Sequence, residues 1–145
     1  MQTLEKEIRP WGSYEVLLDS DNCKVKRITV EPGQRLSYQY HTKRREQWTV
    51  VKGLLTIVLD DDKVFRASGQ SISILLGAKH RAWNETDEVV QFIEVQTGTY
   101  FGEDDIIRLE DDYNREDKNP FFHLEDGNYI GGLTMPKENT NKLNK

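Results

Sequence analysis

Four side chains in the middle of this chain have the types and the spacing of a metal site. They offer two imidazole nitrogens, one carboxylate and one amide oxygen, which suit a borderline divalent cation. Because they leave at least one coordination position open for a substrate, we expect a catalytic rather than a structural metal site. The predicted ligands are Gln39, His41, Glu46 and His80.

Strands are the elements that would bring these ligands together. Gln39 and His41 are two positions apart, so they face the same side of a strand. Glu46 follows a short polar turn, and a hairpin there would return it to the level of His41. His80 begins a later strand after a turn at 76–79. A small β-barrel would place the three strand ends in one mouth.

A short basic segment lies beside the predicted ligands in a chain whose net charge is -5. The segment is Lys43-Arg44-Arg45, and it predicts a small anionic ligand such as a sugar phosphate; a solvated turn is the alternative. Arg44 and Arg45 suit the phosphate because a guanidinium can bind it through two nitrogens. Arg108 and Lys26 are further candidates for binding the substrate.

Short β-rich runs fill the chain as far as residue 96. Turn residues separate them, and no helical period longer than about two turns occurs before Gly102. Their recurrence roughly every 8–12 residues predicts an all-β sandwich or barrel. The predicted strands are 14–18, 23–30, 36–41, 47–51, 54–59, 63–67, 71–75, 80–83 and 89–96.

The length of 145 residues predicts a single domain with its own core. We expect a barrel domain with a short N-terminal arm over residues 1–115, followed by a partly ordered C-terminal extension over 116–145. Within the arm, the residues 4–8 before Pro10 predict one helical turn.

Composition narrows the classes of function. The negative net charge disfavours binding to nucleic acid. The chain has no apolar stretch of about 18 residues and no signal-peptide region, so we expect a cytoplasmic protein with no membrane partner. The single cysteine, Cys23, cannot form an internal disulfide, which fits a reducing compartment.

The two ligand segments resemble the two-part signature of the cupin superfamily, with Gln39 at a position where most members have histidine. The ligand set is similar to the zinc ligands of mannose-6-phosphate isomerases. From about Arg9 to Arg115 the chain resembles the cupin domain of the type II enzymes. In many members, that domain is the C-terminal part of a bifunctional isomerase and mannose-1-phosphate guanylyltransferase. The matching blocks are Arg9-Pro10-Trp11-Gly12-Ser13-Tyr14, Lys24-Val25-Lys26-Arg27-Ile28, Pro32-Gly33-Gln34-Arg35-Leu36-Ser37 and Gly98-Thr99-Tyr100-Phe101-Gly102-Glu103-Asp104-Asp105-Ile106, followed by Arg108.

The resemblance implies a jelly-roll-like cupin barrel that binds zinc at the four ligands; Mn, Co, Ni or Fe suit the same ligands. It implies interconversion of mannose 6-phosphate and fructose 6-phosphate through an enediol whose charge the metal stabilises. A homodimer is also implied, because cupins often exchange edge strands. Moving a proton between C1 and C2 requires a catalytic group, and the candidates are Lys43, Arg44 and Glu103.

The chain departs from the family pattern at three histidines, which are replaced by Thr42, Lys43 and Gln47. None of them is a ligand position, but the substrate chemistry could differ. A second interpretation is therefore a non-catalytic cupin that binds a sugar phosphate or a nucleotide sugar. A metal-free cupin and an iron oxygenase are further alternatives; Gln39 argues against the oxygenase, whose chemistry favours three histidines and one glutamate. The resemblance covers the cupin domain alone, so guanylyltransferase activity is not implied.

Overall fold

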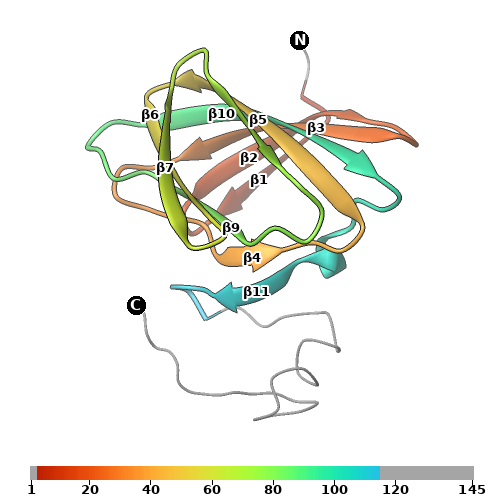
Figure 1. The fold of residues 1–145 in the computed structure, drawn as a ribbon. Coiled ribbons are helices and arrows are strands. Elements are labelled where there is room, and N and C mark those ends of the chain that lie inside the picture. The colour runs from red at the N-terminus through yellow and green to blue at the C-terminus, as the bar shows by residue number, and fades with distance from the viewer. Residues whose placement is uncertain (1–2, 115–145) are drawn as a thin grey trace.

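Two antiparallel β-sheets form the protein, and the computed structural model describes residues 3–114 of it. The elements are β1 (Glu5–Arg9), β2 (Gly12–Asp19), β3 (Cys23–Val30), β4 (Tyr38–Tyr40), β5 (Arg44–Lys52), β6 (Leu54–Leu59), β7 (Asp62–Ala67), β8 (Ser71–Ile74), β9 (His80–Trp83), β10 (Val90–Gly98), the 3-10 helix η1 (Glu103–Asp105) and β11 (Ile107–Glu110). One sheet has the order β1-β2-β3-β10-β5-β8, and the other has the order β11-β4-β9-β6-β7 (Figure 1). Within residues 3–114, no helix is long and apolar enough to cross a membrane.

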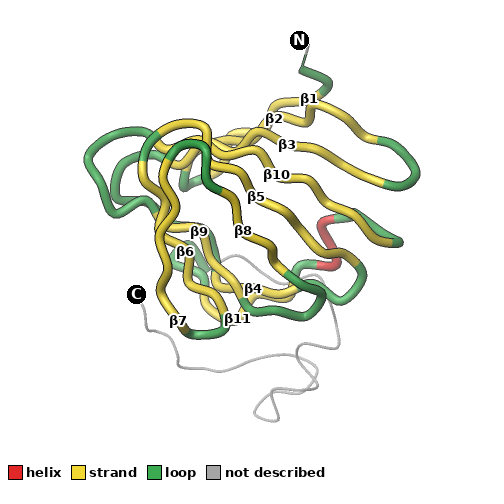
Figure 2. The backbone as a smooth tube through the Cα atoms, turned by 45° about the horizontal axis from the view of Figure 1, so that its top comes forward, coloured by secondary structure: helices red, strands yellow, loops and turns green. Residues whose placement is uncertain are grey.

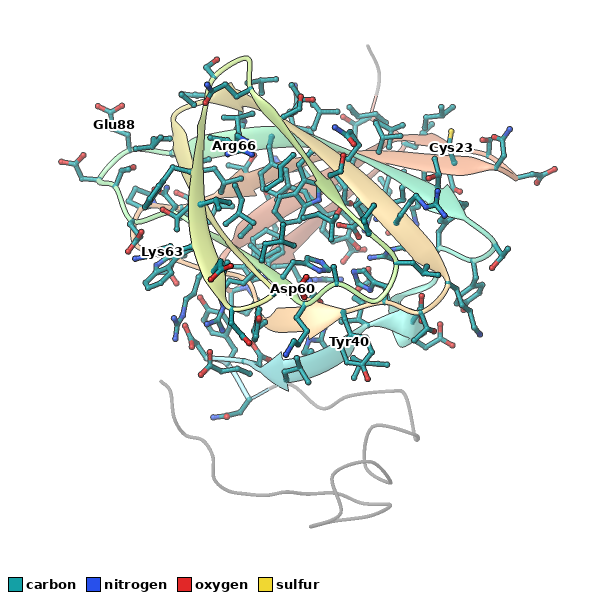
Figure 3. All side chains as sticks on the ribbon, viewed as in Figure 1. Cys23, Tyr40, Asp60, Lys63, Arg66 and Glu88 are labelled. Atoms are coloured by element: carbon teal, nitrogen blue, oxygen red, sulfur yellow. The ribbon has the colours of Figure 1, made fainter. Side chains whose placement is uncertain are left out.

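The alternation of side chains along each strand decides what lies between the sheets. Every second residue is buried over 44–50 in β5 and over 90–96 in β10. Because neighbouring side chains point to opposite faces of a strand, these positions form the interior. Trp48 and Phe92 pack there with their ring centroids 4.6 Å apart. Figure 3 shows side chains filling the space between the sheets, with Cys23 outside it at the start of β3.

Two connections depend on residues that tolerate a positive φ angle. Asp60 and Asp61 close the β6–β7 hairpin with φ angles of 48° and 74°, as a tight two-residue turn requires. Gly98 ends β10 with a φ angle of 150°, and a Cβ atom there would collide with the carbonyl oxygen of Lys43. Glycine therefore allows β10 to approach the chain where it enters β5.

The N-terminal arm is extended, so the predicted helical turn over residues 4–8 is wrong. Glu5–Arg9 forms β1, which pairs in antiparallel register with β2 and lies at the edge of the six-stranded sheet (Figure 2). Pairing with β2 satisfies backbone groups that a single helical turn would leave without partners. Strand β11 and helix η1 were not predicted, and the expected extension over 116–145 lies outside the described residues.

Side-chain ion pairs hold strand β11 and the residues after it to the sheet, in addition to the pairing of β11 with β4. Arg81 is 4% exposed; its Nη1 lies 2.6 Å from Oε1 of Glu110, and its Nε donates to the carbonyl oxygen of Leu36. Arg35 binds both carboxylate oxygens of Asp112. These contacts hold β11, which carries Arg108 toward the interior cavity.

Candidate metal centre and adjoining cavity

Three predicted ligands meet in the interior from three separate parts of the chain. Nε2 of His41 lies 3.1 Å from Oε2 of Glu46, and Nε2 of His80 lies 3.8 Å from Oε1 of the same carboxylate. One ligand atom from each residue falls within 4.8 Å of the others, and all three residues are buried. The structure therefore brings together the His-Glu-His group that the sequence spacing predicted.

The chain reaches this arrangement by crossing between the sheets rather than by the expected hairpin. Strand β4 belongs to the five-stranded sheet and β5 to the six-stranded sheet, so His41 lies at the crossing and Glu46 faces it from the opposite layer. The sequence of a short polar turn does not show whether the next strand stays in the same sheet, so it could not distinguish this crossing from a hairpin. Gln39 pairs in register with His80 across β4 and β9, which places both on one face.

Backbone carbonyls fix the orientation of both imidazole rings. Nδ1 of His80 lies 2.9 Å from the carbonyl oxygen of Ala78, and Nδ1 of His41 lies 3.3 Å from that of Asp105. When Nδ1 carries the proton for such a bond, Nε2 presents its lone pair to the centre. Nε2 of His80 is buried and has no hydrogen-bond partner within residues 3–114, as expected of a nitrogen placed for a metal.

The charge of Glu46 is stabilised from several sides. Burial alone would raise its pKa, but the facing His41 and Arg44 outweigh burial and hold the pKa well below the usual value. Nε1 of Trp48 donates to Oε1 at 2.9 Å, and Nε of Arg44 donates to Oε2 at 3.0 Å. Burial also lowers the pKa of His80 to about 4, so its imidazole is neutral at pH 7 and can donate a lone pair.

These residues fit a divalent metal of the borderline class. Two imidazole nitrogens and one carboxylate oxygen are a common ligand set for such ions, and Gln39, in register with His80, can add an amide oxygen. Arg44 is the side chain that must adjust, because its Nη2 lies 3.3 Å from Nε2 of His41. A metal bound at His41 needs the lone pair that this guanidinium contacts.

An open cavity adjoins the centre, and Gln39 and Arg44 belong to its wall. Among residues 3–114, its lining contains four basic and two acidic side chains, so its charge is mainly positive. Such a wall favours an anionic ligand. The charged residues are Arg9, Lys26, Arg44, Arg108, Glu94 and Glu103.

The predicted substrate and catalytic residues divide between this cavity and the outer surface. Lys26, Arg108, Arg44 and Glu103 line the cavity. Lys43 and Arg45 are exposed and do not line it, and Nζ of Lys43 lies 5.3 Å from the ring centroid of Tyr100. Arg45 points outward because it alternates with the inward-facing Arg44 and Glu46 along β5.

Two further acidic residues belong to the site: Glu94, which the sequence did not single out, and Asp105, which lies in the matching block that ends at Ile106. Glu94 lines the cavity from β10 and is 5% exposed; burial and the neighbouring charge of Glu46 raise its pKa to about 8. Nε2 of Gln96 donates to its Oε1 at 2.7 Å. Asp105 is 3% exposed and accepts hydrogen bonds from the backbone amides of Thr42 and Lys43. The sequence did hold a signal for Glu94, because it follows Val90 and Phe92 at every second position on the buried face of β10.

The two-sheet barrel with a buried His-Glu-His group has the architecture of a cupin with a candidate metal centre, as predicted. The chain belongs to the family described as "Mannose-6-phosphate isomerase C-terminal", which matches residues 1–111. This assignment confirms the family resemblance. The match covers the arm, both sheets and every residue of the candidate site.

Curated relatives carry a similar segment within longer chains. The xanthan biosynthesis protein XanB of Xanthomonas campestris pv. campestris (strain B100) is 44% identical over 110 residues, covering 76% of this chain and 24% of XanB. The alginate biosynthesis protein AlgA of Pseudomonas aeruginosa is 46% identical over 107 residues, covering 74% and 22%. A mannose-1-phosphate guanylyltransferase of Escherichia coli (strain K12) is 43% identical, also covering 74% and 22%. This chain therefore spans about a quarter of the length of the relatives it matches.

Solved structures share the fold. The capsular polysaccharide assembling protein CapF of Staphylococcus aureus superposes with a TM-score of 0.64 at 20% identity, over 73% of this chain and 34% of CapF. A sugar phosphate isomerase of the cupin superfamily from Silicibacter pomeroyi gives a TM-score of 0.57 at 24% identity, over 66% of this chain and 71% of that one. At these identities the likeness concerns the fold alone, and it confirms the predicted cupin barrel.

Proposed function

We propose that this chain is a metal-dependent aldose–ketose isomerase that interconverts mannose 6-phosphate and fructose 6-phosphate. The observation that carries the proposal is the position of the His-Glu-His group beside a cavity whose wall is mainly positive. A reaction at a sugar carbonyl needs an electrophile at one end of the substrate and a site for the phosphate at the other. Membership of the mannose-6-phosphate isomerase family supports the choice of sugar phosphate.

Under this proposal, His41, Glu46 and His80 would hold the metal together with Gln39, and zinc is the ion we expect. When bound, such a metal would polarise the sugar carbonyl and stabilise the negative charge that develops on its oxygen. Arg44 lies within hydrogen-bond reach of Glu46 and also lines the cavity, so it is placed to orient the oxygens of the reacting end. We assign the phosphate to the cavity cations, including the predicted Lys26 and Arg108.

Glu94 is the side chain that we propose for proton transfer. Isomerisation removes the proton from C2 of the aldose and returns it to C1 of the enediol while the hydroxyl proton moves from O2 to O1, so one carboxylate can serve both transfers at carbon. Glu94 is buried, lines the cavity, and is oriented by the amide of Gln96. The exposed side chain of Lys43 does not line the cavity, so we prefer Glu94 to Lys43 for this role.

A coupled assay for conversion of mannose 6-phosphate to fructose 6-phosphate tests the proposal. Metal-stripped protein is compared with protein reloaded with Zn, Mn or Co, and His80→Ala serves as the ligand variant. Turnover that requires metal and disappears in His80→Ala supports the isomerase. A folded protein that gives no turnover with any of these metals would overturn it. In that case, saturable binding of the sugar phosphate would identify the alternative, a binding cupin without catalysis.

A further inference from the structure

Two basic side chains meet over one aromatic ring on the wall of the cavity. Nζ of Lys26 lies 4.1 Å from the ring centroid of Tyr14, and Cζ of Arg9 lies 5.2 Å from it. Nη2 of Arg9 also donates to the hydroxyl of Tyr14 at 3.3 Å. Lys26 is 5% exposed, so its charge is nearly removed from water. Two cations gathered in this way require a negative partner.

Nη1 of Arg9 pairs with Glu7 at 2.9 Å, and Glu103 is the acidic partner that Arg9 and Lys26 share, although it holds both loosely. Its carboxylate oxygens lie 3.5 Å from Nζ of Lys26 and 3.9 Å from Nη2 of Arg9. By contrast, Arg27–Glu15 and Arg81–Glu110 approach to 2.6 Å. The side chain of Glu103 is 40% exposed. Weak, long contacts with a partly hydrated carboxylate are the kind that a better-fitting anion can replace.

Electrostatics keep Glu103 in its charged form. Burial would raise its pKa, but Lys26, Arg9 and Arg44 outweigh burial and lower it. The backbone beneath Glu103 is anchored separately, because the carboxylate of Asp105 in the same 3-10 turn binds the amides of residues 42 and 43. The Glu103 side chain can therefore rotate away without unfolding η1.

We propose that Arg9 and Lys26 form the subsite for a phosphate monoester, and that Glu103 occupies this subsite until the ligand's phosphate displaces it. A phosphate dianion carries more charge than a carboxylate and has three terminal oxygens, so it can contact both cations at hydrogen-bonding distance. The inference rests on the proposed function for the identity of the ligand. It adds Arg9, from the N-terminal arm, to the binding residues and gives Glu103 the role of a displaceable counter-ion.

Inorganic phosphate is the probe, titrated by calorimetry into the full chain at low ionic strength without added metal. Glu103→Gln removes the competing carboxylate and should bind phosphate about three- to tenfold more tightly. Lys26→Met and Arg9→Gln should each weaken binding about tenfold or more. Asp104→Asn is the matched control, since it removes the same charge from an exposed neighbouring position and should leave the affinity unchanged. Circular dichroism establishes that each variant is folded.

Tighter binding in Glu103→Gln with unchanged binding in Asp104→Asn supports the displacement. Equal or weaker binding in Glu103→Gln overturns it, as does an absence of phosphate binding to the unaltered chain. If Lys26→Met fails to fold, Arg9→Gln on the edge strand still tests the subsite. The titration uses neither metal nor turnover, so its failure can be distinguished from failure of the isomerase assay.

Discussion

Asp105 ties the first metal ligand to the crossing between the sheets, and replacing it with alanine should weaken both the fold and the metal site. Its carboxylate accepts hydrogen bonds from the amide of Thr42 at 3.1 Å, the hydroxyl of Thr42 at 2.8 Å and the amide of Lys43 at 3.0 Å. Its own carbonyl oxygen lies 3.3 Å from Nδ1 of His41. One residue thus holds the turn after His41 and also the orientation of that imidazole.

The expected cost follows from these bonds. A hydrogen bond contributes about 1 kcal/mol net, so the loss of three predicts about 3 kcal/mol for Asp105→Ala. Bonds to a charged acceptor can contribute more, but Thr42 and Lys43 are exposed and can recruit water when the carboxylate is removed. Asp105→Asn keeps one acceptor oxygen and should lose roughly 1–2 kcal/mol. The backbone carbonyl that contacts Nδ1 of His41 remains in Asp105→Ala, but loss of the three side-chain bonds lets the turn shift, and disturbing the partner of a ligating imidazole typically weakens metal binding by about 10–100-fold.

Urea denaturation and calorimetric titration of zinc measure the two effects in the same variants. Asp104→Ala is the matched control, because Asp104 precedes Asp105 in the same turn but is exposed. We expect Asp105→Ala to unfold at distinctly lower urea and to bind zinc at least tenfold more weakly than the control. If the two variants unfold within about 0.5 kcal/mol of each other, the three bonds contribute nothing net and the reasoning fails.

Four further substitutions test the site and the core. His80→Ala should reduce bound metal from one ion per chain to none, as measured by elemental analysis after dialysis; retained metal would remove His80 from the ligand set. Glu94→Gln should keep its metal but lose most isomerase turnover, so turnover near the original rate would exclude it from proton transfer. Arg45→Ala, on the outer face of β5, should change turnover less than twofold. Phe92→Ala, at 0% exposure, should cost about 3–5 kcal/mol in urea denaturation.

The strands of this protein were largely predictable because burial follows sequence alternation. The predicted runs 23–30, 54–59 and 80–83 coincide with β3, β6 and β9. In each, β-branched or aromatic residues lie between turn residues, so local chemistry and tertiary packing favour the same element. The arm differs, because Glu5–Arg9 becomes a strand only through pairing with β2, a partner that a local pattern does not reveal.

The metal ligands were predictable for a different reason from the other cavity residues. Histidines and a glutamate at fixed spacing carry a chemical signal that does not depend on knowing the sheet order. Glu94 and Arg9 carry no such spacing. They reach the cavity because β10 lies between β3 and β5, and because β1 extends the same sheet. The sequence analysis grouped Arg45 with Arg44 as a phosphate ligand because both are basic. Side chains alternate along β5, however, so Arg44 points inward and Arg45 points outward.

The three departures from the family pattern bear on whether this chain can act as an isomerase. Thr42, Lys43 and Gln47 stand where the family usually has histidine, and all three are exposed. Thr42 and Lys43 contribute backbone amides to Asp105, which any residue except proline could supply, and the Thr42 hydroxyl adds a third hydrogen bond to the same carboxylate. Gln47 points out of the barrel and accepts a hydrogen bond from Ser73 at 2.6 Å. Because none of the three lines the cavity, the replacements leave the ligands and the positive wall in place, and they do not favour the binding-only alternative over catalysis.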